Sequence, residues 1–528
     1  MSRFAGTTIL LRSYLRRDRW MLLGWIAANV AVYWSQAVGT RSIYPNQADL
    51  DRAAASMESN PAFVALAGPT RALDTIGGQV AWQSSVTGAV LAALMSMFLV
   101  TRHTRAEEES GRDELVRSSV VGRDASVLAT VVLVILANAV LAAGITLSLV
   151  GYDLEWAGCL ALGLSAGLCG LVFGAVALVA AQVVTSARAA NGVAGTAIGI
   201  AYVLRAIGDV GPGALTWLSP IGWSQGVRAF AGERWWPLAL LAGVAVVLTV
   251  TALELLHRRD FGSGPWPARP GPARGALHSE LGLVWRLQRG AVIGWCVALF
   301  VGGLAYGSVG DGVEDLLGDS ETSRDIFLAG GGGTDLVDSF YGVAIVMLAL
   351  IACGFTVTSV LRMRGEEVDG HAELLLATAV SRRRWSWAHL TVTIGGSAAG
   401  LVLGGLGLGV GYAIVTGDAG AVLRYVPAAA QQVLSVLAVG AIAWFGYGLS
   451  SRFGVPGWLA VAFCFVVLMF ATVLQMPEWM QDVSPFHRLP LLPAESFDLA
   501  AAVGVGVVVV LLAIAGDQLL RRRDLSHQ

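Results

Sequence analysis

The chain has 528 residues, of which 55% are hydrophobic and only 14% are charged, and its mean hydropathy is +0.66. Soluble domains carry about 25% charged residues, so this composition excludes an ordinary soluble protein and predicts an integral membrane protein. The net charge of −2 gives no reason to expect a nucleic-acid partner.

All 35 basic residues are arginines, because the sequence contains no lysine. The five cysteines lie in apolar runs, and neither they nor the seven histidines show the spacing of metal ligands or of catalytic groups. We therefore predict no disulfide, no metal site and no catalytic residue in this chain.

Twelve apolar stretches are long enough to cross a bilayer, which needs about 20 residues of helix. The predicted fold is therefore an all-α integral membrane protein with about twelve transmembrane helices. Before the first span, residues 4–19 show no signal-peptide cleavage site and are expected to form a short amphipathic helix at the membrane interface. The spans are expected at about 20–38, 79–100, 125–150, 157–185, 189–207, 237–257, 290–309, 341–361, 386–416, 425–449, 455–474 and 499–520.

Arginine counts orient these spans, because cytoplasmic loops are enriched in basic residues. With the N-terminus inside, the cytoplasmic segments hold 26 arginines and the external loops hold eight. We therefore expect a multi-pass protein of the plasma membrane with both termini in the cytoplasm. Arg205, Glu254 and Asp517 lie toward the ends of spans, where snorkelling to the interface accounts for them.

A charged block follows the second span and recurs in the second part of the chain. Residues 105–123 and 364–382 align without gaps, and eight of these nineteen positions are identical. On a single helix, the shared positions from Glu107 to Val121 fall within an arc of about 140°, so we expect each block to present one face of a short helix. The identical pairs are Arg105/Arg364, Glu107/Glu366, Glu108/Glu367, Gly111/Gly370, Glu114/Glu373, Leu115/Leu374, Val121/Val380 and Arg123/Arg382.

Three other landmarks recur in the same order, which indicates an internal duplication. The sequence predicts two tandem six-helix halves, 1–261 and 278–528, joined by a cytoplasmic Pro/Gly linker at 262–277. The landmarks are LLHRRD (255–260) with LLRRRD (519–524), Gly24-Trp25 with Gly294-Trp295, and Ser219-Pro220 with Ser484-Pro485.

A duplicated twelve-span membrane protein is most often a transporter, and its energy source is constrained by the sequence. Ion-coupled carriers usually need ionisable groups near the bilayer midplane, and the span centres contain almost none. A phosphate-binding loop for ATP requires a lysine, which the chain lacks. ATP hydrolysis would therefore need a separate subunit, for which the two charged blocks are the expected docking places.

The R-x-E-E-x-x-G-x-x-E-L pattern in both blocks resembles the first cytoplasmic segment of type-2 ATP-binding-cassette (ABC) exporter permeases. The fused twelve-span form looks like actinobacterial permeases for polyketide or tetronasin-type antibiotics and for multidrug efflux. The resemblance implies a non-enzymatic permease subunit that moves amphipathic or apolar small molecules, such as drugs or polyketide antibiotics, out of the cell. It also implies two copies of an ABC ATPase subunit on the cytoplasmic face, which bind ATP and Mg²⁺, and no cofactor in this chain.

The resemblance assigns roles to particular residues. Segments 4–19 and 278–289 would be elbow helices, and segments 217–236 and 483–497 would form short extracellular re-entrant helices. The ATPase-coupling helices would use Arg105, Glu107, Glu108, Gly111, Glu114, Leu115 and Arg123 in the first half and Arg364, Glu366, Glu367, Gly370, Glu373, Leu374 and Arg382 in the second. The cargo path between the halves would be lined by Gln79, Trp82, Gln83, Ser84, Asn191, Tyr202, Tyr341, Phe463 and Phe470.

Two other classes of protein stay open. An ion-coupled twelve-span secondary transporter fits the span count, and a membrane-bound enzyme such as a lipid transferase fits the composition. Efflux that survives a protonophore but stops without ATP would exclude the ion-coupled carrier.

Overall fold

The structure is a computed structural model, and it divides the chain into two compact units, Met1–Gly271 and Pro272–Gln528. Its described part is helical throughout and contains no β-strand, so the prediction of an all-α membrane protein is confirmed. The described residues are 3–44, 46–58, 64, 67–118, 121–211, 213–259, 277, 279–308, 336–450, 455–471 and 476–523.

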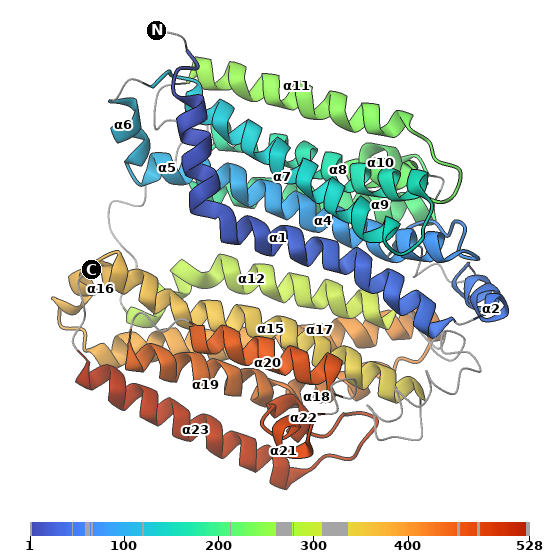
Figure 1. Cartoon of the computed structure of the whole chain (residues 1–528). Coiled ribbons are helices and arrows are strands. Elements are labelled where there is room, and N and C mark those ends of the chain that lie inside the picture. Colours follow the sequence, from blue (N-terminus) through green and yellow to red (C-terminus); the bar gives the residue numbers. More distant parts are fainter. Residues whose placement is uncertain are drawn as a thin grey trace. The chain divides into compact units, whose positions relative to one another are not determined.

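Six long helices make up most of unit 1, and they run alongside one another (Figure 1). The long helices are α1 (Thr7–Ile43), α4 (Ile76–His103), α7 (Ala125–Val150), α8 (Trp156–Val183), α9 (Ala187–Val210) and α11 (Trp236–Arg258). The short helices are α2 (Gln47–Glu58), α5 (Arg105–Glu109), α6 (Arg112–Arg117), the 3₁₀ helix η1 (Leu215–Leu218) and α10 (Pro220–Gly226).

The described part of unit 2 has a similar succession of long and short helices. Its long helices are α12 (Glu280–Gly307), α15 (Leu336–Val368), α17 (Arg382–Thr416), α18 (Ala421–Gln431) with α19 (Val433–Leu449), α20 (Val455–Phe470) and α23 (Leu499–Arg522). Its short helices are α16 (His371–Leu376), α21 (Glu478–Gln481) and α22 (Pro485–Arg488).

Each of the twelve apolar stretches forms a helix, and eleven of the described helices are long and apolar enough to cross a membrane. The exception is the stretch expected at 455–474, where α20 has 16 residues. The tenth span is interrupted between α18 and α19, and α18 contains Pro427, which cannot donate the backbone hydrogen bond of a regular helix. The expected linker at 262–277 lies outside the described residues, except for Leu277.

Small residues let the spans of each unit approach closely. In unit 1, α8 packs against α4, α7 and α11. A Cβ atom at Gly163 of α8 would lie 2.5 Å from the Ala142 carbonyl oxygen of α7, so only glycine fits there. In unit 2, a Cβ at Gly407 of α17 would lie 2.1 Å from the Phe300 carbonyl oxygen of α12. Such close backbone contacts drive helix association in membranes, where lipid removes the usual hydrophobic advantage of packing.

The segments expected as elbow helices are not separate elements. Residues 7–43 form one continuous helix, α1, and its N-terminal section runs at an angle to the remainder (Figure 1). Residues 280–307 likewise form the single helix α12. No loop separates the amphipathic and the apolar sections, because neither sequence contains a proline or a turn signal at the junction.

The loop after the first span contains a helix that the sequence analysis did not predict. This helix, α2, begins where the Asn46 side chain accepts a hydrogen bond from the Asp49 backbone nitrogen at 3.0 Å, and its middle is rich in alanine. The asparagine cap and the alanines are ordinary helix signals. A pattern of apolar spans does not reveal this helix, because it is short and contains several charged residues.

Arg205 does not snorkel, which corrects the sequence-based interpretation. Its side chain is fully buried on α9, 3.4 Å from the Asp209 carboxylate and 4.8 Å from the Tyr202 ring. Asp209 also accepts a hydrogen bond from Thr216 Oγ1 at 2.8 Å. A buried ion pair therefore satisfies this arginine where water does not reach it.

Candidate functional site

Each charged block is broken in two by its glycine, so the expected single helical face is wrong. In the first block α5 ends at Glu109, and Gly111, with φ of +71°, precedes α6. In the second block α15 ends at Val368, and Gly370, with φ of +74°, precedes α16. A left-handed glycine is the usual way to end a helix. A Cβ at either glycine would meet no atom of the chain within 4 Å, so the left-handed backbone conformation accounts for the repeated glycine.

In unit 1, the acids at the start of the block form ion pairs with arginines of α1, of α5 itself and of the segment after α11. Glu107 lies 2.7 Å from Arg17 of α1. Glu108 lies between two guanidinium groups, those of Arg105 and Arg259, with each nitrogen–oxygen distance 2.5 Å. The Arg105 side chain is buried and also donates to the Ala181 carbonyl oxygen of α8. This part of the block is therefore bonded into unit 1.

In unit 2, the corresponding acids are bonded in the same manner. Glu366 lies 3.2 Å from His389 Nε2 and accepts a hydrogen bond from Trp385 Nε1, both on α17. Glu367 lies 2.6 Å from Arg523 and accepts a hydrogen bond from the Tyr447 hydroxyl at 2.8 Å.

The ion pairs Glu108–Arg259 and Glu367–Arg523 join two repeated motifs in each unit. Arg259 follows α11 in LLHRRD, and Arg523 occupies the same position after α23 in LLRRRD. In both units the block after the second span is thus tied to the end of the last span. Sequence reasoning found both repeats but did not name these two arginines as site residues. The repeat could have indicated them, since two motifs that recur in the same order in both units are candidates for contact with each other.

A buried histidine lies beside each block. In unit 1, His103 Nε2 lies 2.5 Å from the buried Asp18 carboxylate of α1. In unit 2, His389 Nδ1 lies 3.2 Å from the Gln288 amide of α12. Asp18 and Gln288 both precede the repeated Gly-Trp pair by six residues, so α1 and α12 contribute a polar group at the same place.

The second part of each block carries the repeated residues that stay exposed. Leu115 of α6 is 74% exposed and Leu374 of α16 is 73% exposed, next to Glu114 and Glu373, which are exposed as well. We call the Glu-Leu pair of each block its tip. The two units therefore share an exposed leucine beside an exposed acid at the same position of the block.

The arginines of the two blocks are not equivalent. Arg105 is buried, whereas its counterpart Arg364 is exposed. Arg123 is exposed, whereas its counterpart Arg382 donates to the Arg523 carbonyl oxygen at 2.7 Å. The repeat therefore preserves the acids and the tips more closely than the arginines.

The candidate cargo residues of the second span lie at the start of α4. Gln79 is buried and donates to the Leu73 carbonyl oxygen, and it accepts from Gln83 at 3.2 Å. Trp82 Nε1 donates to the Gly68 carbonyl oxygen at 2.8 Å, and Ser84 bonds within its own helix. These side chains hold unit 1 together at this end.

The other cargo candidates have mixed surroundings. Tyr341 is fully buried, with its ring 5.3 Å from that of Tyr412 and 5.1 Å from that of Tyr425. Asn191, Tyr202 and Phe463 are half-buried on α9 and α20. The side chain of the remaining candidate, Phe470, lies outside the described part of the structure.

The described residues contain no cluster of three or more histidine, cysteine or acidic side chains that could hold a metal ion. The helices and their two repeated units define a multi-pass membrane protein.

Comparison with known proteins identifies the family. Residues 277–521 match the family described as the C-terminal domain of the multidrug efflux system permease Rv1217c. Over 531 aligned residues the chain is 38% identical to the multidrug efflux system permease protein Rv1217c of Mycobacterium tuberculosis (strain ATCC 25618 / H37Rv), covering 99% of this chain and 96% of the relative. The chain therefore belongs to the Rv1217c family of permeases, and the resemblance to exporter permeases is confirmed.

Proposed function

We propose that this chain is the membrane subunit of an ATP-driven ABC exporter. Its cargo would be amphipathic or apolar compounds such as drugs or polyketide antibiotics, and the multidrug efflux name of its relative supports that class. The observation that carries the proposal is the paired tip: the same exposed Glu-Leu pair in both units, joined in each to the last span.

The proposed partner is a separate ABC ATPase subunit. The chain has no lysine, so it lacks the residue that a Walker-type phosphate loop uses to reach the β- and γ-phosphates. ATP and Mg²⁺ would then bind to the partner. Two tips per chain favour two ATPase copies, one on each tip. With the ATPase in the cytoplasm, the tips and both termini would lie there too, as the arginine distribution predicts.

The contacts inside each unit give a route from the tip to the membrane helices. A partner that moves α5 and α6 acts on α11 through Glu108 and Arg259, and it acts on α1 through Glu107 and Arg17. In unit 2, the same displacement acts on α23 through Glu367 and Arg523. The Glu108–Arg259 and Glu367–Arg523 pairs are largely buried, so salt screens them little. The cargo path itself would lie between the units, with α4, α9, α15 and α20 as the helices expected to line it.

The exposed tips make a cleaner experiment than the acids. Reversing Glu107 or Glu108 would break internal ion pairs and damage the fold together with any docking surface. Leu115→Asp and Leu374→Asp change side chains that contact little of their own unit. Ser110→Asp is the matched control, because it adds the same charge to the same block at an exposed position where the second block has Asp369.

The test is drug uptake into inverted membrane vesicles that contain the full chain together with an ABC ATPase subunit from the same organism. We expect ATP-dependent uptake that a protonophore leaves intact, that Ser110→Asp preserves, and that the double leucine variant reduces at least tenfold. Uptake driven by a proton gradient without ATP would instead establish an ion-coupled carrier. Full ATP-driven uptake by the double variant would show that the tips are not the coupling surface.

A further inference from the structure

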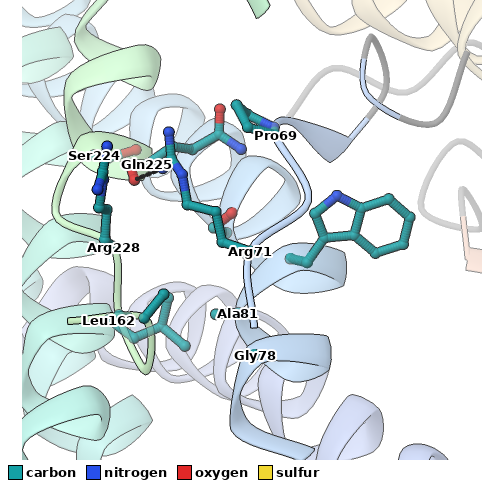
Figure 2. Close-up of a pocket in the computed structure, with 12 residues that line it drawn as sticks. Pro69, Arg71, Gly78, Ala81, Leu162, Ser224, Gln225 and Arg228 are labelled. Atoms are coloured by element: carbon teal, nitrogen blue, oxygen red, sulfur yellow. Dashed lines mark hydrogen bonds between the residues drawn. The ribbon is translucent and has the colours of Figure 1, made fainter. Parts of the chain in front are cut away.

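A pocket of about 40 Å³ lies in unit 1 at the end of α4 that is opposite to the charged block (Figure 2). Its walls come from α4, α8, α10 and the segments before α4 and after α10. Since α4 has 28 residues and each adds about 1.5 Å, roughly 40 Å of helix separates this pocket from the block. The pocket and the tip are therefore on opposite sides of the membrane.

Hydrogen bonds between its walls hold the pocket in shape. Arg71 Nη1 donates to the Gln225 carbonyl oxygen at 3.0 Å, and Gln225 Nε2 donates to the Ala67 carbonyl oxygen at 2.6 Å. Trp82 Nε1 fixes the same segment through the Gly68 carbonyl oxygen. The segment before α4 is thus bound to both α10 and α4, so the pocket exists before any ligand arrives.

Positive charge in this pocket is not balanced by acids. Arg71 and Arg228 both line it, and no lining residue is acidic. Neither arginine forms an ion pair with a carboxylate in the described part of the chain. The carboxylate that does act on Arg71, that of Asp209, is already bonded to Arg205 and Thr216. Burial and the nearby charge of Arg228 lower the pKa of Arg71, which is the expected effect of a cation lacking a counter-ion.

The pocket has a polar side and an apolar side. Figure 2 shows Arg71, Ser224, Gln225 and Arg228 gathered on one side, and Leu162, Gly78 and Ala81 on the other. The side-chain oxygen of Gln225 is buried and accepts no hydrogen bond within the described structure. A ligand that carries a hydrogen-bond donor beside an acidic group would satisfy this oxygen and the arginines together.

The corresponding place in unit 2 is filled. Tyr341 occupies the position of Trp82 in the duplication and packs into a cluster with Tyr412 and Tyr425. The next residue, Gly342, is so close to Leu491 that a Cβ would lie 2.7 Å from that side chain. Arg488, which ends the short helix α22, is paired with Asp482 at 2.9 Å. The arginine at this end of unit 2 thus has a carboxylate partner, unlike Arg71 and Arg228 of unit 1.

We propose that this pocket binds a phosphate or carboxylate group carried by an amphipathic molecule. Guanidinium groups recognise these two anions through paired, charge-assisted hydrogen bonds. Leu162 and Ala81 would contact the apolar part of the ligand. The ligand is either the anionic headgroup of a lipid or an acidic small molecule. Binding at equilibrium needs no ATP and no ATPase, so this inference stands apart from the proposed transport mechanism.

The test measures binding of a fluorescent short-chain phosphatidic acid to the full chain in neutral maltoside micelles. The phosphatidylcholine with the same fluorophore is the reference probe. We expect phosphatidic acid to bind at least tenfold more tightly, because a desolvated phosphate gains charge-assisted bonds to both arginines. Arg228→Gln should remove about tenfold of that affinity, and Arg71→Lys should change it less than Arg71→Gln does. Arg488→Gln in unit 2 is the matched control and should leave binding unchanged.

Competition then distinguishes the source of the anion. If decyl phosphate displaces the fluorescent lipid at a much lower concentration than inorganic phosphate does, the ligand is amphipathic. Displacement by decanoate would show that the pocket also binds carboxylates. Equal binding of the two fluorescent lipids would overturn the proposal. Unchanged affinity for phosphatidic acid in Arg228→Gln would also overturn it, since this change removes no side-chain hydrogen bond of the described structure. An equal loss of affinity in the Arg488→Gln control would do the same.

Discussion

The two units are alike at one end of their helices and different at the other. At the end with the charged block, each unit has a left-handed glycine, an exposed Glu-Leu tip and an acid paired with the arginine after its last span. At the opposite end, unit 1 has a pocket with two arginines that have no carboxylate partner, whereas unit 2 has packed tyrosines and a pocket in which Arg488 is paired with Asp482. The end that is alike in both units is the end expected to bind two copies of one partner. The end that differs is suited to a ligand that binds only one unit.

The buried acid of the charged block has different partners in the two units. Glu108 has two arginine partners, Arg105 and Arg259, whereas Glu367 has one arginine and the neutral Tyr447 hydroxyl. Both acids remain largely buried. The acid of unit 2, Glu367, therefore depends more on its single arginine than Glu108 does.

The largest effect is expected from removing Arg523. Arg523→Ala would leave the buried Glu367 carboxylate without a cationic partner, which costs about 3 kcal/mol or more. Arg259→Ala should destabilise unit 1 less, because Arg105 still faces Glu108. Thermal unfolding of the detergent-solubilised chain measures both. A larger loss in Arg259→Ala, or no loss in either variant, would contradict the account that Glu367 depends on one arginine and Glu108 on two.

A second large effect is confined to unit 1. Asp209→Ala should destabilise that unit by roughly 3 kcal/mol, because it leaves the buried Arg205 guanidinium without its carboxylate. The double change Arg205→Met with Asp209→Ala should recover most of the loss, since an apolar pair needs no counter-charge. The melting temperatures of the three proteins check this. If the single and double variants melt together, Arg205 is not held by Asp209.

A smaller and equal effect is expected at the two glycines. Gly111→Ala and Gly370→Ala should each destabilise the local turn by about 1 kcal/mol, because alanine resists the left-handed conformation and has no steric contact there. Amide hydrogen exchange in α6 and α16 measures the local opening. Faster exchange in only one block would show that the two turns are not equivalent.

The smallest effect concerns the filled end of unit 2. Tyr341→Phe should cost only about 0.5 kcal/mol, because the hydroxyl donates a long bond of 3.4 Å to the Gly307 carbonyl and the ring packing is kept. Tyr341→Ala, the comparison variant, should cost several times more by leaving a cavity among the tyrosines. Equal unfolding temperatures for the two variants would show that the aromatic cluster does not support this end.

Apolar runs and repeats were enough to predict the helical class, the spans and the two charged blocks. They did not show where the blocks bend, because a glycine within a helical pattern can be tolerated or can end the helix. Nor did they show that Glu107 and Glu108 are bonded internally, since their partners Arg17 and Arg259 are distant in sequence. The pocket was missed for the same reason: Arg71 and Arg228 belong to different loops.

The central claim, that the two tips each hold one ATPase subunit, is tested most directly by native mass spectrometry of the full chain co-expressed with that subunit. The account predicts two ATPase copies on the wild-type chain and on the Ser110→Asp control. It predicts one copy on Leu115→Asp or Leu374→Asp, and none on the double variant, with thermal unfolding unchanged throughout. Two copies on the double variant would contradict the claim.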